Sequence, residues 1–457
     1  MNPVAVTLGV FALVYLGMLL GRLPRLQLDR TGVALLGAIA LVALGVLTIE
    51  EAARAVDLPT IALLFALMVL SAQLRLGGFY GRVAEAVTRA GLSPPWLLLA
   101  VVLLAGVLAA VFTNDIVCLA VAPVLIDACR RRRLDPVPFL LALACAANVG
   151  SAATLIGNPQ NILIGETLGL SFVGYLADAG VPAVAGLVAT WAVIAGQQRG
   201  PWTVAPEPSR AATVTVAAPE EGDETAPALD RWQTGKGLLV TTALLVAFLA
   251  TDAQRDLVAL AAAGVLLCSR RLHSRRMLGL VDWQLLVLFC GLFVVNHALE
   301  ATGVTARAVA GLANVGIDPG DPGWLFGLTI ALSNTVSNVP AVMLLAPLVA
   351  SVPGGYPLAG PLLALTSTLA GNLLIVGSIA NPDRRRQGGP PRDRDRLAAP
   401  RADRRAGGAR HAGARDGLAV AAELDRLNLP PRGRCVSDQR RDCQPSELAR
   451  VFRTGLS

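Results

Sequence analysis

The sequence is short of charge and of the residue types that carry most enzyme chemistry. Only 16% of its 457 residues are charged, it has three histidines, and Lys236 is its only lysine. Soluble globular domains carry about 25% charged residues. Here 54% of the residues are hydrophobic and the mean hydropathy is +0.59. These values predict an all-α polytopic membrane protein.

Metal-binding and nucleophilic motifs are also lacking. The seven cysteines include no Cys-x-x-Cys pair, and the histidines are scattered at His273, His297 and His411. Free cysteines in apolar segments usually act as small core residues. The sequence has no nucleophile–base pair and no metal-ligand spacing, so we expect neither an enzyme nor a cofactor, apart from Na⁺ as a coupling ion.

The net positive charge of the chain comes from its C-terminal end. Residues 1–381 hold 21 Lys and Arg against 22 Asp and Glu, whereas residues 382–457 hold 18 Arg against 10 acidic residues. The formal net charge of +7 therefore belongs to the tail. It gives no reason to expect nucleic-acid binding by the apolar part.

The apolar segments predict several membrane crossings. A helix needs about 17–25 apolar residues to cross a bilayer core about 30 Å thick. Two further stretches, 94–128 and 322–350, are too long for one crossing and are polar at their centres. For each of these two we predict a re-entrant helical hairpin whose tip lies at membrane depth. The predicted crossings are 3–21, 29–49, 57–75, 136–165, 170–196, 235–251, 256–270, 281–299 and 359–381.

Arginine placement predicts the orientation. With the N-terminus outside and both hairpins returning to their own side, the cytoplasmic loops hold 18 Lys and Arg, and the outer loops hold only Arg54, Arg255 and Arg307. This asymmetry follows the positive-inside rule. It predicts a multi-pass protein of a bacterial inner membrane with a cytoplasmic linker at 198–234, rich in Pro, Ala and acidic residues. The cytoplasmic loops counted are 22–30, 75–93, 130–133, 199–236 and 270–276.

Polar interruptions recur along the chain. Asn114 is followed nine residues later by Pro123, and Asn338 is followed nine residues later by Pro347. Gly157-Asn-Pro-Gln-Asn161 is likewise matched by Gly377-Ser-Ile-Ala-Asn381. The first hairpin would enter from the cytoplasm and the second from outside. We therefore predict two inverted repeats, 1–197 and 235–381, which is typical of secondary transporters with a site built from broken helices.

The chemistry of these interruptions fits ions. Polar side chains at membrane depth are costly and persist mainly where they line a cavity or bind something. Asn and Thr supply neutral oxygens to Na⁺, and helix N-termini favour anionic oxygens. The alternative for any single Ser or Thr is a hydrogen bond to a neighbouring helix. Asp115 has two readings: it carries a proton or neutralises a cation, or it caps the second hairpin helix.

These motifs resemble those of the ion transporter superfamily, which includes divalent-anion/sodium symporters, citrate transporters, arsenite pumps and anion-permease relatives. The resemblance covers about residues 1–381. It implies a site between two hairpin tips and two unwound helices, an elevator-type movement and, often, a homodimer. The first tip, with Asp115, is closer to the arsenite-pump pattern than to that of dicarboxylate symporters. The motifs are Phe112-Thr-Asn-Asp115, Gly157-Asn-Pro-Gln-Asn161, Ser333-Asn-Thr-Val-Ser-Asn338 and Gly371-Asn-Leu-Leu-Ile-Val-Gly-Ser-Ile-Ala-Asn381.

The residues expected at the site follow from the chemistry of the polar interruptions and from the family resemblance. As substrate ligands we predict Thr113, Asn114, Asn158, Ser337, Asn338 and Ser378. As cation ligands we predict Asn114, Asp115, Gly157, Asn161, Asn338, Gly377 and Asn381.

The tail departs from the resemblance, which requires one further crossing after the last broken helix. Instead, Pro382-Asp-Arg-Arg-Arg386 opens an Arg-rich stretch without an apolar segment. If the reading frame is shifted by one base, these codons can encode the apolar sequence Leu-Ile-Val-Val. We therefore expect that residues 382–457 reflect a frameshift near codon 382 and that the second repeat is incomplete. The alternative is a genuine disordered basic tail.

The functional expectation is a secondary active transporter of a small anion such as a dicarboxylate, citrate or sulfate, coupled to Na⁺ or H⁺. Two alternatives share the fold: arsenite or antimonite efflux, and sodium/proton antiport. An alternative of another class is a channel or a membrane sensor that does not transport. Membrane lipid and a small anion are the expected partners, and nucleic acid is not.

Overall fold

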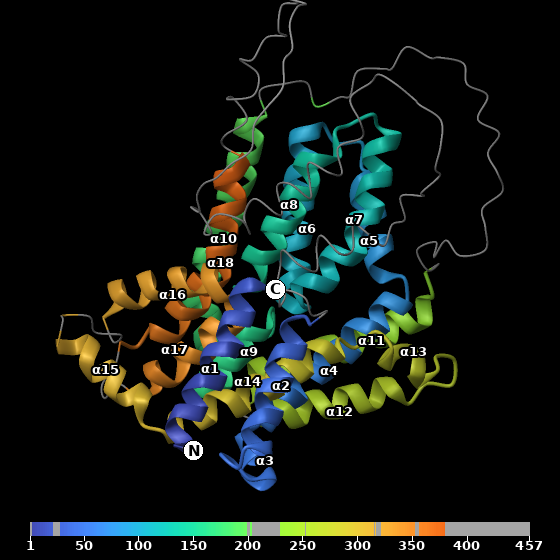
Figure 1. Ribbon diagram of the computed structural model, residues 1–457. Coiled ribbons are helices and arrows are strands. Elements are labelled where there is room, and N and C mark those ends of the chain that lie inside the picture. The colour runs from blue at the N-terminus through green and yellow to red at the C-terminus, as the bar shows by residue number, and fades with distance from the viewer. Residues whose placement is uncertain are drawn as a thin grey trace, which may run out of the picture. The chain divides into compact units, whose positions relative to one another are not determined.

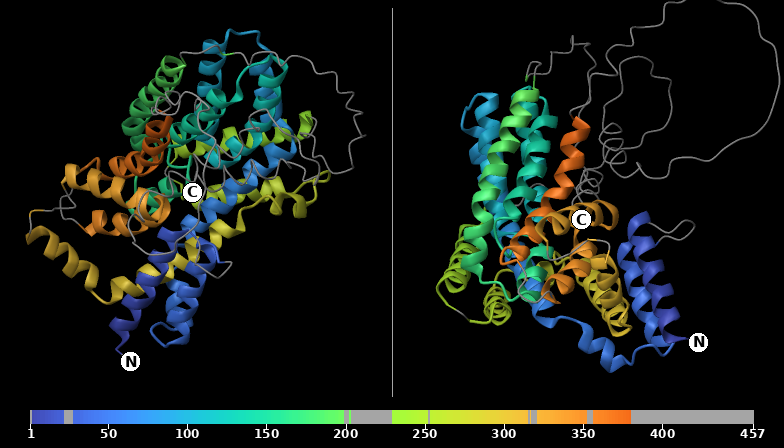
Figure 2. Two further views of the ribbon diagram at one scale, coloured as in Figure 1. Left: turned by 45° about the horizontal axis from the view of Figure 1, so that its top comes forward. Right: turned by 90° about the vertical axis from the view of Figure 1, so that its left-hand side faces the viewer.

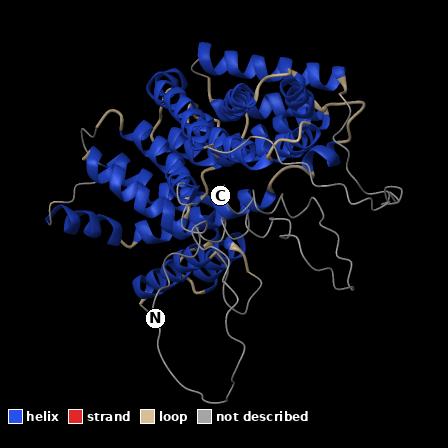
Figure 3. Cartoon of the chain, turned by 90° about the horizontal axis from the view of Figure 1, so that it is seen from above, coloured by secondary structure: helices blue, strands red, loops and turns tan. Residues whose placement is uncertain are grey.

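The computed structural model describes residues 2–21, 28–198, 202, 229–251, 253–314, 316, 321–351 and 356–379. Within these ranges every regular element is a helix (Figure 3). The tail 382–457, most of the linker 198–234 and Asn381 lie outside the described residues, so the expectations that concern them remain predictions.

Figures 1 and 2 show the helices of the described residues. They are α1 (Pro3–Leu20), α2 (Arg30–Ala43), α3 (Ile49–Ala55), α4 (Leu58–Leu76), α5 (Phe79–Arg89), α6 (Pro94–Val111), α7 (Asn114–Arg131), α8 (Pro136–Ser151), α9 (Pro159–Thr167), α10 (Phe172–Gln197), α11 (Arg231–Ala250), α12 (Arg255–Leu267), α13 (Ser274–Leu278), α14 (Trp283–Ala301), α15 (Val304–Asn314), α16 (Pro322–Val336), α17 (Asn338–Ser351) and α18 (Ala359–Ile379).

The chain divides into two compact units, Met1–Gly371 with Leu456–Ser457, and Asn372–Gly455. The described part of the second unit is Asn372–Ile379, which is helical.

Length and composition let several helices cross a membrane. Six described helices, α1, α4, α6, α10, α11 and α14, are long and apolar enough for a crossing. Many of their large apolar side chains are exposed, for example Leu13, Val107 and Val181. Such exposure would be unfavourable in water but is favourable in lipid. The prediction of an all-helical protein with several membrane spans is therefore confirmed. The inverted symmetry of the two halves remains a prediction.

Local chemistry fixes where many helices begin. Proline stands in the first turn of α1, α4, α6, α8, α9 and α16, where its missing N–H costs no hydrogen bond. Aspartate caps several N-termini: Asp57 accepts from Thr60 N at 2.9 Å, and Asp321 accepts from Gly323 N at 2.9 Å. These caps satisfy backbone donors that the helix itself leaves unpaired.

Both stretches that were too long for one crossing are pairs of helices. The stretch 94–128 forms α6 and α7, which contact each other and are separated by Phe112 and Thr113. The stretch 322–350 forms α16 and α17, which also contact each other and are separated by Ser337. The chain thus breaks at the polar residues that the sequence marked, and α6, α7 and α8 lie side by side (Figures 1 and 2).

The predicted crossing 136–165 is interrupted as expected, but over a longer span. Helix α8 ends at Ser151, a turn region follows, and α9 begins at Pro159. The interruption therefore starts well before Gly157. At the position that should match it, α18 remains helical through Gly377 and Ser378 to Ile379, so no unwinding is seen at those two residues.

Other expected segments differ in extent. The crossing predicted at 29–49 is a shorter helix, α2, followed by a turn and the exposed helix α3. Thr48 and Glu51 form a reciprocal capping box that starts this second helix. Helices α5 and α15 were not predicted from the sequence. They contain polar residues, so they do not form the long apolar runs that predict membrane crossings.

Candidate functional site

The first hairpin tip meets the interruption between α8 and α9. The backbone N–H of Asn114 donates to the carbonyl oxygen of Gly157 at 3.3 Å. Thr113 and Asn114 are both buried. Thr154 Oγ1 also donates to the carbonyl of Ala110 in the last turn of α6. The two polar interruptions of the first half, separated by about 40 residues in the chain, therefore form one site.

Gly157 is required by space at this junction. A Cβ atom on Gly157 would overlap the backbone of Ser151 and would lie 2.8 Å from the carbonyl oxygen of Ala109. Backbone atoms cannot move aside as a flexible side chain can. Glycine therefore lets the interrupted segment lie directly against the end of α6.

Asn158 holds the start of α9. Its Oδ1 accepts from the backbone N–H of Asn161 at 2.9 Å, and Pro159 occupies the first helical position. Its Nδ2 donates to Ser151 Oγ and to Thr368 Oγ1, each at 3.1 Å. Asn158 is fully buried, and both its amide donor and its carbonyl are used within the protein. In this conformation it acts as a helix cap and a bridge to α18, and its role as a substrate ligand remains a prediction.

Asn161 is the residue of this site with an unused oxygen. Its Nδ2 lies within hydrogen-bond distance of Ser151 O at 3.2 Å, Thr154 O at 2.9 Å and Tyr175 Oη at 3.1 Å. Its Oδ1 is buried and has no hydrogen-bond partner. A buried polar atom without a partner is costly, and it marks a place where an ion or a water is expected. A neutral amide oxygen is a suitable ligand for Na⁺.

Thr368 joins the two halves of the predicted repeat. Its carbonyl accepts from Asn148 Nδ2 at 2.8 Å, and its Oγ1 accepts from Asn158 Nδ2 at 3.1 Å and Gln160 Nε2 at 3.2 Å. The sequence motifs predicted none of Thr368, Gln160 and Tyr175 as site residues. The sequence signal that could have identified them was a polar side chain inside an apolar segment. Many such side chains, however, only form hydrogen bonds within their own helix.

The second hairpin tip contributes Ser337 and Asn338, both half-buried. Ser337 has φ 84° and ψ 160°, a conformation that is rare for a residue with a side chain and that ends α16 before α17 starts. Helix α17 packs against α9, the helix that follows the first interruption. Gly377 and Ser378 lie in α18, and Asn381 lies outside the described residues.

Asp115 lies in the first turn of α7. A carboxylate there interacts favourably with the positive end of the helix dipole. The side chain of Thr113, the N-cap residue, makes no capping hydrogen bond to this helix. Both readings of Asp115, as a helix cap and as a group that carries a proton or neutralises a cation, remain predictions.

The described residues contain no group of three or more His, Cys, Asp or Glu side chains that could hold a metal ion. The polar atoms gathered at the first tip are instead backbone carbonyls, backbone amides and neutral Asn, Ser and Thr side chains. Such an environment suits a weakly held monovalent ion and a small solute. Together, the apolar helices and the polar breaks that interrupt them define a polytopic membrane transport protein.

Comparison with known proteins places it in a family. The family profile of the citrate transporters (CitMHS) matches residues 12–370, and the chain therefore belongs to this family. It is a membrane transporter and not an enzyme, and the expected resemblance to the ion transporter superfamily is confirmed.

Its relatives include two transporters that align with most of the chain. It is 32% identical over 395 residues to the uncharacterized transporter Rv2684 of Mycobacterium tuberculosis, covering 83% of this chain and 89% of the relative. It is 29% identical over 422 residues to the silicon efflux transporter LSI3 of Oryza sativa subsp. japonica, covering 78% and 85%. Among solved structures, the YdaH transporter of Alcanivorax borkumensis matches with a TM-score of 0.45 and 15% identity, covering 84% of this chain and 92% of that one.

Proposed function

We propose that this transporter moves a small anion across the bacterial inner membrane, coupled to Na⁺ or H⁺, with the cation bound at the first tip. The observation that carries the proposal is the buried Oδ1 of Asn161, which has no hydrogen-bond partner inside a densely bonded polar site. A dehydrated Na⁺ would supply the missing partner. Membership of the citrate transporter family supports an organic or inorganic anion as the substrate.

The anion is proposed to bind beside the helix N-termini at the breaks. Helices α7 and α17 begin at Asn114 and Asn338, and their first N–H groups carry partial positive charge. The predicted substrate ligands Thr113, Ser337 and Ser378 remain part of the proposal, as do Gly377 and Asn381 for the cation. Movement of the two hairpins against the remaining helices would give alternating access, and a homodimer is expected from the family resemblance.

The test is uptake into proteoliposomes with imposed Na⁺ or H⁺ gradients, screening dicarboxylates, citrate, sulfate and arsenite. We expect saturable uptake that depends on one of the two gradients and that falls strongly in Asn114→Ala and Asn338→Ala. Thr190→Val, on α10 and bonded only to its own helix, serves as a control for a polar-to-apolar change. Flux that does not saturate and ignores both gradients would refute a coupled carrier.

A second candidate is efflux of an inorganic oxyacid such as arsenite. It is favoured by the similarity to LSI3, whose name describes a silicon efflux transporter, and by Asp115 at the first tip. Everted membrane vesicles distinguish the two directions. Proton-driven accumulation of arsenite or silicic acid in such vesicles, without citrate or dicarboxylate transport, would replace the first proposal with the second.

A further inference from the structure

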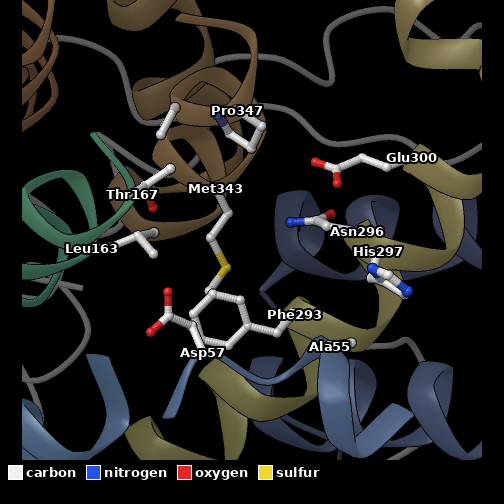
Figure 4. A pocket seen from close by; sticks show the side chains of 11 residues that line it. Ala55, Asp57, Leu163, Thr167, Phe293, Asn296, His297, Glu300, Met343 and Pro347 are labelled. Carbon is white, nitrogen blue, oxygen red and sulfur yellow. The ribbon is translucent and has the colours of Figure 1, made fainter. Parts of the chain in front are cut away.

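A separate cavity of about 170 Å³ lies between α9, α14, α17 and the start of α4 (Figure 4). Helices α9 and α17 line it with Leu163, Thr167 and Met343. Both helices begin at candidate-site residues, Asn158 being the cap of α9 and Asn338 the first residue of α17. The cavity therefore lies along the helices that lead away from the proposed transport site, and it contains none of the residues predicted from the sequence.

Asn296 provides an unused donor in this cavity. It is 8% exposed, and its Oδ1 accepts a hydrogen bond from Tyr15 Oη at 3.0 Å. This bond turns the Nδ2 atom toward the side of the cavity where Met343 and Thr167 lie (Figure 4). The Nδ2 atom has no hydrogen-bond partner. A buried amide donor without a partner indicates that something with an acceptor oxygen occupies the cavity.

The charged groups of the cavity are acidic. Asp57 and Glu300 present carboxyl groups and His297 an imidazole, and the lining includes no lysine or arginine. Arg255, at the start of α12, is paired with Glu166 at 3.3 Å, and Arg54 precedes the lining residue Ala55 on α3. A cleft bordered by carboxylates lowers the concentration of anions and raises that of cations. A multivalent anion such as citrate is therefore disfavoured here.

We propose that this cavity binds a hydrated monovalent cation, Na⁺ in the first place. A water occupies about 30 Å³, so the cavity has room for an ion with several of its waters. The carboxylates of Asp57 and Glu300 accept hydrogen bonds from these waters, and Asn296 Nδ2 donates to one of them. This arrangement accounts for both the acidic lining and the unused donor. A bare metal ion could not satisfy the Nδ2 donor of Asn296, because it has no acceptor atom.

Binding of Na⁺ in the cavity does not depend on the proposed function, but the role of this bound ion in transport rests on it. If the transporter is cation-coupled as proposed, the cavity is the place where the coupling ion gathers before it loses its waters at Asn161. Negative charge beside the entrance to a site raises the local concentration of the ion and its rate of entry. The carboxylates would then set the apparent affinity for Na⁺ without contacting the transported anion.

The first test measures binding without transport. The full-length protein in detergent is titrated with NaCl, with N-methylglucamine chloride keeping the ionic strength constant, and the thermal unfolding midpoint is followed. The variant Asp57→Asn/Glu300→Gln is compared with the wild type. Asparagine is as good a helix cap as aspartate, so Asp57→Asn preserves the start of α4. Glu50→Gln, an exposed carboxylate on α3 outside the cavity lining, is the control for loss of charge.

We expect Na⁺ to raise the midpoint of the wild type and of Glu50→Gln, and the half-saturating Na⁺ concentration to rise at least about fivefold in the double variant. Asn296→Leu, which removes the donor, should weaken the Na⁺ effect as well. An equal Na⁺ effect in the double variant, or no Na⁺ effect in the wild type, would overturn the proposal.

The second test separates this inference from the proposed function. In proteoliposomes, the double variant should need more Na⁺ for half-maximal uptake while the KM for the anion at saturating Na⁺ stays unchanged. If the wild type shows no cation-coupled uptake, the proposed function fails, whereas the thermal titration still decides whether the cavity binds Na⁺. If uptake is Na⁺-coupled but the variants respond to Na⁺ as the wild type does, only the cavity proposal fails.

Discussion

The substitution Asn161→Leu tests the central contact of the candidate site. Leucine has the same branching and the same number of side-chain heavy atoms, so little space is gained or lost. It removes the donor that Asn161 supplies to the carbonyl oxygens of Ser151 and Thr154, at 3.2 and 2.9 Å, in a fully buried position. Leaving a buried acceptor unpaired costs about 1–3 kcal/mol, so two such carbonyls amount to about 2–6 kcal/mol.

That loss is a large fraction of the free energy of unfolding of a typical domain, about 5–15 kcal/mol. We therefore expect a clearly lower thermal unfolding midpoint in detergent and loss of coupled uptake in proteoliposomes. The matched control is Asn334→Leu, because Asn334 is exposed on α16 and its amide bonds only Ile330 O of the same helix. A midpoint for Asn161→Leu equal to that of the control would refute the argument that this amide holds the interruption together.

Two further substitutions test other parts of the fold. Gly157→Ala places a Cβ onto the Ser151 carbonyl and should destabilise the protein by about 1–3 kcal/mol and impair transport, whereas Gly180→Ala, whose Cβ has ordinary contacts, should change neither. Burial raises the pKa of Glu166, just beyond the predicted crossing, and Arg255 opposes that shift. Because the folded state then binds the proton more tightly than the unfolded state, stability should fall as the pH rises from about 4 through the raised pKa. This fall should be larger in Arg255→Gln and absent in Glu166→Gln when thermal midpoints are compared across pH. A flat profile in all three proteins, or a Gly157→Ala protein as stable and active as the wild type, would contradict these expectations.

The sequence predicted the breaks before α7, α9 and α17 because their causes are local. Pro159 lacks a backbone donor, Asn158 caps the helix that follows, and Ser337 with Asn338 interrupts an apolar run that is too long for one crossing. Each of these effects acts within a few residues, so it can be read without knowing the neighbours. The position of the interruption before α9 was less predictable, since it starts at Ala152, where no proline or asparagine marks it.

The site itself was only partly predictable. The sequence selected Asn114, Gly157 and Asn161, and the structure brings these three together. It also selected Asn158 as a substrate ligand, but the direction of its side chain, toward Ser151 and Thr368, follows from packing between helices far apart in the chain. Counting polar residues in apolar segments cannot tell a ligand from a group that another helix satisfies.

Composition and local backbone chemistry alone thus determined that this chain is a helical membrane protein with polar breaks, because the cost of burying charge and unpaired backbone in lipid applies to each segment separately. Only the tertiary structure decided which polar atoms meet. Thr368 reaches Asn158 across 210 residues, and Tyr15 turns Asn296 toward a cavity from 281 residues away. Hydrogen bonds act over about 3 Å, so their partners depend on how the helices pack and not on sequence separation.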